Sequence, residues 1–208
     1  MRTFLLSIAL LFTSLLPAQA HAVQPRDGDL LFVTADRTGL SGAIHDATAS
    51  AGALSYDHVA LVAHDADAAV VLHADEKGSR EQPLPEFLAE AAAKGRTVVL
   101  YRLKAPQHPT IAGAIARART MLGKPYNATY VQDEGSYYCS DFIERAFRPD
   151  AVFQTQPMNF RNLQTGEMPA YWVEFYGSRG MQVPQDAPGT NPNDMSRAPV
   201  LVSVGILH

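Results

Sequence analysis

Cys139 is the only cysteine of this 208-residue chain, and its position favours reactivity. It stands in the stretch SYYCSDFIERAF, residues 136–147. Apolar residues follow it at helical spacing, which predicts a helix that begins at Cys139 and has one apolar face: Phe142, Ile143, Ala146 and Phe147. Free backbone N–H groups and the helix dipole favour a thiolate there, so we expect a lowered thiol pKa. Asp141 opposes this effect, and a thiolate would need an imidazolium beside it.

Two other interpretations of the lone cysteine remain open at this point. A buried cysteine can pack as a small inert hydrophobe. A cysteine without an internal partner can also form an intermolecular disulfide, because exported proteins meet an oxidising compartment. The residues that could lie beside Cys139 must decide between these alternatives.

Two histidines, His58 and His73, are candidates for that neighbour. They bound the segment HVALVAHDADAAVVLH, which predicts two strands joined by a turn at residues 64–67. A turn centred between residues 65 and 66 would pair residues 63 with 68, 61 with 70, and His58 with His73. Their Cβ atoms would then lie roughly 4.5–5.5 Å apart on one face. A slip of one residue would turn one imidazole to the other face.

The other five of the seven histidines have no role in this interpretation. His64 belongs to the predicted turn, and we expect it to be exposed to solvent. His45 and His108 lie in loop-like segments without a partner pattern. His21 and His208 lie near the ends of the chain.

Three alternatives account for His58 and His73. With Cys139 they could bind zinc, although no short Cys/His spacing supports such a site. They could instead form a nucleophile–base–orienter triad with Cys139. Finally, they could be two structural histidines with satisfied hydrogen bonds.

The elements that would position these residues form a mixed pattern. Strands are predicted at residues 30–34, 97–103, 170–177 and 199–207, besides the two histidine strands. Helices are predicted at residues 84–95 and 109–125, a short helix within a loop at 39–53, and a loop rich in Pro, Gly and Asn at 184–199. Strands and helices without regular alternation indicate an α+β domain.

Composition and the N-terminus limit the function further. The chain is 47% hydrophobic and 18% charged with a net charge of −4, as in ordinary globular proteins. This charge gives no reason to expect nucleic acid or an anionic membrane surface as a partner. Arg2, the apolar run 4–16 and the sequence AQA at 18–20 predict a secretory signal peptide over residues 1–20 rather than a membrane anchor. We therefore expect residues 21–208 to be one exported, periplasmic domain without stable membrane insertion.

Five segments, in order, resemble a known family. They are DGDLLF, SYDHVALV, VVLHADEKGSREQPLPEFL, MLGKPYN and YYCSDFIERAF, with a weaker sixth, APGTNPNDMS, at residues 187–196. Together they resemble the permuted papain-like amidases of the YiiX/YaeF type, which are relatives of the NlpC-type cell-wall hydrolases. In this permuted group the histidine strand precedes the cysteine helix, as it does here.

The resemblance implies a permuted papain-like fold, with an antiparallel sheet or small barrel packed against the cysteine helix. It gives Cys139 the place of the nucleophile and His58 that of the general base. His73 takes the place of the orienting residue, where many permuted relatives carry a glutamate. The Cys139 backbone N–H, with Tyr138 or Tyr126, is the candidate oxyanion donor.

The implied activity is hydrolysis of an amide or ester through an acyl-enzyme, without a cofactor. The expected substrate contains a peptide or acyl group, and peptidoglycan peptides lead because of the NlpC kinship. A lipid acyl hydrolase or acyltransferase is the first alternative, and a non-catalytic binding or metal-binding module is the second. The sequence leaves the oligomeric state open.

Overall fold

The protein has one main antiparallel sheet. The computed structural model describes residues 23–66 and 68–207, so the signal peptide expected at 1–20 and both His21 and His208 lie outside the described residues. The six-stranded sheet has the following order: β4 (Gly78–Pro83), β3 (Ala68–Asp75), β2 (Tyr56–Asp65), β1 (Leu30–Thr34), β5 (Val98–Leu103) and β8 (Leu201–Leu207). The α+β fold class is therefore confirmed.

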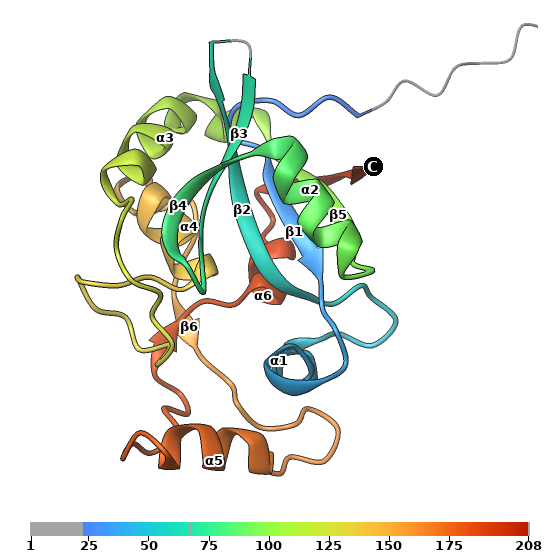
Figure 1. The fold of residues 1–208 in the computed structure, drawn as a ribbon, viewed down its shortest axis with the longest axis vertical. Coiled ribbons are helices and arrows are strands. Elements are labelled where there is room, and N and C mark those ends of the chain that lie inside the picture. The colour runs from blue at the N-terminus through green and yellow to red at the C-terminus, as the bar shows by residue number, and fades with distance from the viewer. Residues whose placement is uncertain (1–22, 67, 208) are drawn as a thin grey trace, which may run out of the picture.

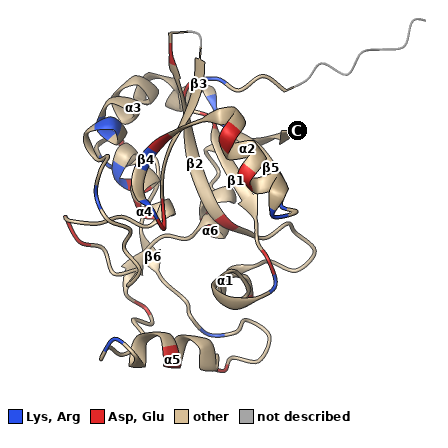
Figure 2. Ribbon diagram, in the orientation of Figure 1, with Lys and Arg blue, Asp and Glu red and all other residues tan. Residues whose placement is uncertain are grey.

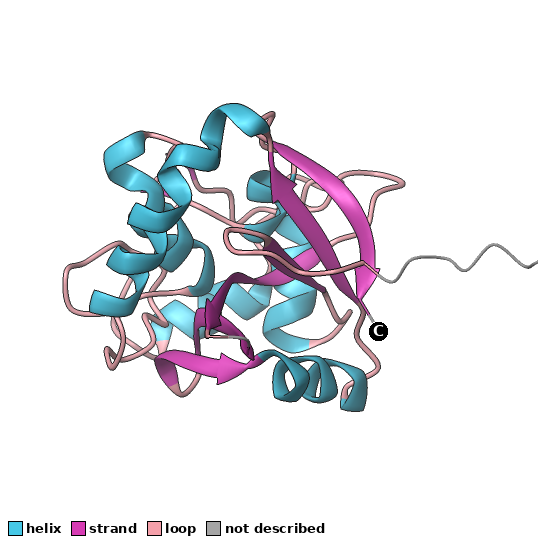
Figure 3. Cartoon of the chain, turned by 90° about the horizontal axis from the view of Figure 1, so that it is seen from above, coloured by secondary structure: helices cyan, strands magenta, loops and turns pink. Residues whose placement is uncertain are grey.

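Helices cover both faces of this sheet. They are α1 (Gly39–Thr48), α2 (Leu84–Ala93), α3 (Ile111–Thr120), α4 (Cys139–Phe147), α5 (Ala170–Gly177) and α6 (Pro192–Ser196), with 3₁₀ turns at Ala105–Thr110 and Arg148–Asp150. Helix α2 lies on one face, whereas α3 and α4 lie on the other (Figures 1 and 3). A short pair of strands, β6 (Gln156–Pro157) and β7 (Pro188–Gly189), lies outside the main sheet.

Strand β2 is apolar on both faces because each face has its own core. Val59 and Leu61 pack on the α4 side, and Ala60 and Val62 pack on the α2 side. All four are fully buried. His58 has the same parity as Ala60 and Val62, so strand alternation directs it to the α2 face.

The predicted pairing of β2 with β3 is wrong by two residues. Leu61 lies opposite Leu72 and Ala63 lies opposite Val70, so the turn falls one residue later than expected. Since strand side chains alternate with a period of two, this shift leaves every residue on its predicted face. His58 and His73 are therefore diagonal neighbours on one face rather than directly opposed ones.

Three other secondary-structure predictions differ from the structure. Residues 170–177 form helix α5 rather than a strand, because Trp172 and Tyr176 lie one helical turn apart and are both buried. Strand β4 was missed, since its sequence GSREQP has little β propensity and it is held by pairing with β3. The expected loop at 184–199 contains β7 and α6.

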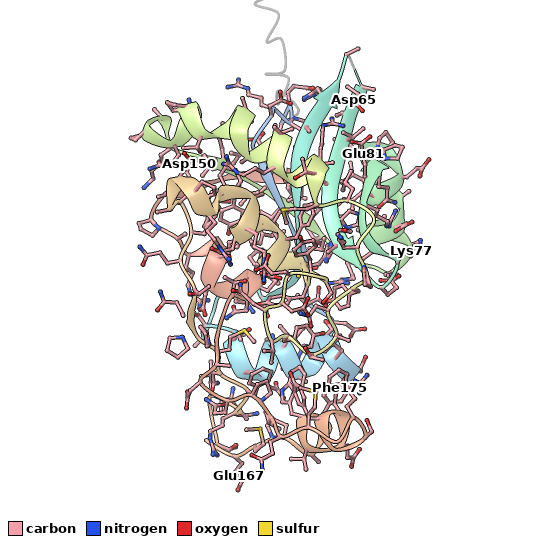
Figure 4. All side chains as sticks on the ribbon, turned by 90° about the vertical axis from the view of Figure 1, so that its left-hand side faces the viewer. Asp65, Lys77, Glu81, Asp150, Glu167 and Phe175 are labelled. Carbon is pink, nitrogen blue, oxygen red and sulfur yellow. The ribbon has the colours of Figure 1, made fainter. Side chains whose placement is uncertain are left out.

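A third core, the aromatic cluster, joins α5 to α1. Its buried members are Ala43, Tyr130, Tyr138, Met158, Phe160, Trp172 and Tyr176. Figure 4 places Phe175, on α5, near the opposite end of the molecule from Asp65 at the tip of the β2–β3 hairpin. The cysteine helix lies between these two ends, so it can contact both the sheet and the aromatic cluster.

Acidic and basic residues are both spread over the described surface, and neither kind is gathered in one large patch. Acidic positions occur on α2 and α5, whereas basic positions occur on α3 (Figure 2). Among the described residues, no helix has the length and apolar character needed to cross a membrane.

Candidate active site

Helix α4 begins at Cys139, as its sequence pattern predicts. The preceding residue, Tyr138, has an extended backbone (φ −96°, ψ 167°) and its side chain does not cap the helix. The N–H groups in the first turn of α4 therefore receive no hydrogen bond from the Tyr138 side chain. Cys139 is 5% exposed, and its Sγ–H points to the carbonyl oxygen of Asp57 at 3.7 Å. The sulfur therefore lies beside the peptide that joins Asp57 to His58.

Burial dominates the acidity of this thiol. It raises the pKa of Cys139 to about 11, although nearby backbone N–H groups of Val59, Ser140 and Cys139 itself act in the opposite direction. The expected lowering of the thiol pKa is therefore wrong for this structure, because loss of solvent outweighs the helix terminus. Cys139 is a neutral thiol at pH 7.

His58 and His73 form a hydrogen-bonded pair. The Nε2 of His58 lies 3.0 Å from the Nδ1 of His73, and the rings meet edge to face at 82°. Phe87 of α2 packs against both rings, at centroid distances of 6.0 and 5.5 Å. Burial lowers the pKa of His58 to about 4, and burial together with the neighbouring His58 lowers the pKa of His73 below its usual value. Both imidazoles are therefore neutral at pH 7.

Near the start of β2, Cys139 and the side chain of His58 lie on opposite faces of the sheet. The sulfur belongs to the core on the α4 side, whereas His58 contacts Phe87 on the α2 side. No hydrogen bond joins these two described residues. Because His73 occupies the Nε2 of His58, the nitrogen left to take a thiol proton is Nδ1. Catalytic hydrogen bonds are often long in ligand-free enzymes and tighten when substrate binds.

Two cavities meet at this point. The first, of about 270 Å³, is lined by both histidines, Phe87 and the charged residues Asp75, Glu76, Glu90, Lys94 and Arg96. The second, of about 50 Å³, is lined by Cys139 and mainly by aromatic and aliphatic side chains, among them Tyr130, Met158, Phe160 and Trp172. Ile44, Asp57 and Tyr126 line both cavities. The two cavities are therefore adjacent, with the histidine pair lining the first and Cys139 lining the second.

The two candidate oxyanion tyrosines differ in their surroundings. The hydroxyl of Tyr138 is buried, accepts a hydrogen bond from the Thr190 N–H at 3.1 Å and contacts the sulfur of Met158 at 4.0 Å. Tyr126 is partly exposed and lines both cavities. Burial, Tyr130 and Cys139 raise the pKa of Tyr126 well above its usual value, so its hydroxyl keeps its proton. Of the two tyrosines, only Tyr126 lines both cavities.

Three further side chains lie at the site without having been candidates from the sequence. Asp57 forms an ion pair with Arg96 and accepts a hydrogen bond from Ser41. Burial lowers the pKa of Arg96, and the charges of Asp36 and Cys139 act in the opposite direction. Gln82, on β4, lies beside His73 of the neighbouring strand β3 and is 2% exposed. Parity along β4 would have indicated Gln82, had that strand been predicted.

The histidines without an expected role lie outside this site. His64 is on β2 rather than in the turn, and it is half-buried rather than exposed because its Nδ1 lies 2.7 Å from Asp27. His45 is on α1, where its Nε2 contacts Arg37. The Nε2 of His108 donates to the carbonyl oxygen of Leu103 at 3.0 Å.

Known proteins match this chain in both sequence and structure. The model of a family described as "Permuted papain-like amidase enzyme, YaeF/YiiX, C92 family" matches residues 24–205. The crystal structure of the metalloprotein yiiX from Escherichia coli O157:H7 is similar with a TM-score of 0.69 and 24% sequence identity, covering 88% of this chain and 98% of that one. No curated protein matches the chain.

The E. coli protein is described as a metalloprotein. In residues 23–66 and 68–207, no group of three or more His, Cys, Asp or Glu side chains is placed to hold a metal ion. His58 and His73 direct one nitrogen of each ring at the other ring rather than toward a shared ion. This geometry does not fit the zinc alternative.

Proposed function

Because this chain belongs to the permuted papain-like amidases, a family of cysteine-type hydrolases, we propose that it hydrolyses an amide or ester acyl bond with Cys139, His58 and His73. The observation that carries this proposal is the 3.0 Å contact between the two imidazoles. The only thiol of the chain lies 3.7 Å from the carbonyl oxygen of Asp57, the residue before His58. Cys139 is the nucleophile, His58 the general base, and His73 the residue that orients His58.

The reaction begins from neutral groups. His58 takes the thiol proton on Nδ1 as the sulfur attacks the carbonyl carbon, and the carbonyl oxygen becomes an oxyanion. The backbone N–H of Cys139 and the hydroxyl of Tyr126 stabilise that oxyanion. The imidazolium then gives its proton to the departing amine or alkoxide, which leaves a thioester on Cys139. A water molecule, deprotonated by His58, hydrolyses the thioester and restores the thiol.

Two substrate classes are candidates for this reaction. Peptidoglycan peptides are supported by the kinship with cell-wall hydrolases and by the expected export of the chain. A substrate with an apolar acyl group is supported by a specific observation, namely the narrow cavity of about 50 Å³ beside Cys139, whose wall is mostly apolar. Of the two, the cavity favours the apolar acyl group.

Two features of this wall point to binding rather than stability. Trp172 belongs to this wall, and its indole N–H is buried without a hydrogen-bond partner among the described residues. Tyr130 has a positive φ of 55°, a strained conformation for a residue with a side chain. Strain of this kind is common at ligand sites.

The proposal is tested by turnover. The protein is incubated with muropeptides, with N-acyl amino acids and with acyl esters, and the products are identified by mass spectrometry. The wild type should cleave at least one class, whereas Cys139→Ala and His58→Ala should lose the activity. His64→Ala is the matched control, since it removes another imidazole from the same strand. Equal turnover by wild type and Cys139→Ala would exclude Cys139 as the nucleophile.

A further inference from the structure

Gln82 is a buried amide that lies beside the histidine pair from the neighbouring strand. On the β3–β4 ladder His73 lies opposite Arg80 and Val71 lies opposite Gln82. Gln82 is therefore the diagonal neighbour of His73 on the same face of the sheet. Both side chains are only 2% exposed.

Each of these two side chains has one buried polar atom without a partner. Within the described part of the chain, neither the Nε2 of His73 nor the Oε1 of Gln82 forms a hydrogen bond of ordinary geometry. A ring nitrogen that can donate and an amide oxygen that can accept are complementary, and leaving both unpaired in the core would be unfavourable. The Gln82 amide is close enough to counteract, in part, the lowering of the His73 pKa by burial.

The tautomer of His73 decides whether His58 can act as a base. A neutral imidazole carries one proton, on Nδ1 or on Nε2. If His73 carries it on Nδ1, it donates to the Nε2 of His58, and the proton of His58 then sits on Nδ1, where it blocks the thiol. If His73 carries it on Nε2, its Nδ1 accepts from the Nε2–H of His58. Only this second arrangement leaves Nδ1 of His58 free to accept a proton.

We propose that Gln82 is a positioning residue whose amide oxygen accepts the Nε2–H of His73 and thereby selects the productive tautomer of both histidines. This inference rests on the proposed function, because it assigns Gln82 a part in the same triad. It also explains how a histidine can serve as the orienting residue. A carboxylate at that position can only accept a hydrogen bond, whereas a neutral imidazole can either donate or accept one. His73 is an acceptor at Nδ1 because Gln82 holds its proton at Nε2.

The proton count closes without ionising Gln82. When the thiol proton moves to Nδ1 of His58, the resulting imidazolium still donates its Nε2–H to His73. The proton is not relayed through His73 to Gln82, because a neutral amide oxygen does not take one. The hydrogen-bonded series Gln82–His73–His58 therefore fixes the orientation of the two imidazoles and does not relay charge.

The direct test is ¹⁵N NMR of histidine-labelled protein at pH 7, since protonated and unprotonated ring nitrogens have distinct shifts. The wild type should show both His58 and His73 protonated at Nε2. Gln82→Leu, which removes the acceptor, should give a mixture of tautomers at His73, and Gln82→Glu, which keeps an acceptor, should restore a single one. Glu81→Gln is the matched control, because Glu81 is on the same strand and pairs with Arg119 instead. A wild-type spectrum with His73 protonated at Nδ1 would overturn the proposal, even if Gln82→Leu failed to fold.

A second readout uses hydrolysis of p-nitrophenyl acetate. Loss of one neutral hydrogen bond should lower kcat of Gln82→Leu about tenfold with little change in KM. Gln82→Glu should recover most of this loss, which a merely structural role would not predict. Unchanged kcat and unchanged tautomers in Gln82→Leu would refute the assignment. If the wild type shows the expected tautomers but no turnover depends on Cys139, the proposed function fails and the tautomer assignment stands.

Discussion

The three reacting side chains are neutral in the resting protein because all of them are shielded from water. The pKa is about 11 for Cys139 and about 4 for His58, so both groups are neutral between pH 4 and pH 11. The resting protein therefore holds no thiolate–imidazolium pair in that range. The proposed mechanism therefore requires proton transfer during attack rather than a preformed nucleophile. His58 must be neutral to act, so activity should be constant near pH 7 and should fall as the pH decreases toward 4.

Alkylation of Cys139 by iodoacetamide tests this protonation state. A thiol pKa of about 11, against roughly 8.5 for free cysteine, means about two orders of magnitude less thiolate at pH 7. We expect labelling slower than that of free cysteine at pH 7, with a rate that continues to increase above pH 9. N-acetylcysteine in the same buffer is the control. Rapid labelling with a plateau near pH 6 would show a resting thiolate–imidazolium pair instead.

At the scale of elements, the site depends on strand parity and on the start of one helix. The alternation of apolar residues was sufficient to place His58 and His73 on one face, although the register was wrong by two residues. The apolar face of α4 was equally clear, and it placed Cys139 at the helix start. Gln82 could not be found in this way, because the polar sequence of β4 becomes a strand only by pairing with β3.

Helix α4 also carries a buried ion pair that can be tested. The Nε of Arg145 donates to the Oδ1 of Asp141 at 2.7 Å, and their side chains are 8% and 0% exposed. Arg145→Ala should lower the free energy of unfolding by about 3–5 kcal/mol at pH 8, because Asp141 would remain buried and charged. Chemical denaturation measures this loss.

The pH dependence of that variant follows from the acidity of Asp141. Burial already raises the pKa of Asp141 to about 6 with Arg145 present. Removing Arg145 should raise it further, so the folded state would bind a proton more readily than the unfolded state, and stability would be lost as pH increases. We therefore expect a smaller loss at pH 5 than at pH 8. The control, Arg197→Ala, breaks the half-exposed pair with Asp194 and should cost about 1 kcal/mol or less at both pH values.

At the scale of the whole molecule, the cavity beside Cys139 is built from segments far apart in the sequence. Helix α1 supplies Ile44 and Ala47, the segment before the cysteine helix supplies Tyr126 and Tyr130, and α5 supplies Trp172. The sequence could not predict it for that reason. Residues 170–177 were expected as a strand, and only as a helix does this segment bury both Trp172 and Tyr176 in the aromatic cluster.

The cavity predicts a dependence on acyl chain length. For p-nitrophenyl esters, kcat/KM should increase from acetate to butyrate, because each buried methylene contributes about 0.8 kcal/mol, or roughly fourfold in rate. Ala47→Leu should narrow the cavity and remove this increase while leaving acetate hydrolysis intact. The Tm of the variant controls for overpacking. An identical chain-length profile in wild type and Ala47→Leu would show that the acyl group binds elsewhere.

The measurement that tests the central claim most directly is the intact mass of the protein during reaction with p-nitrophenyl butyrate. We expect one butyryl group to be added to the wild-type protein, peptide mapping to place it on Cys139, and the adduct to be lost on hydrolysis. His58→Ala should acylate far more slowly, and His64→Ala should acylate like the wild type. Equal acylation of Cys139→Ala, or an adduct mapped to any other residue of the wild type, would contradict the account.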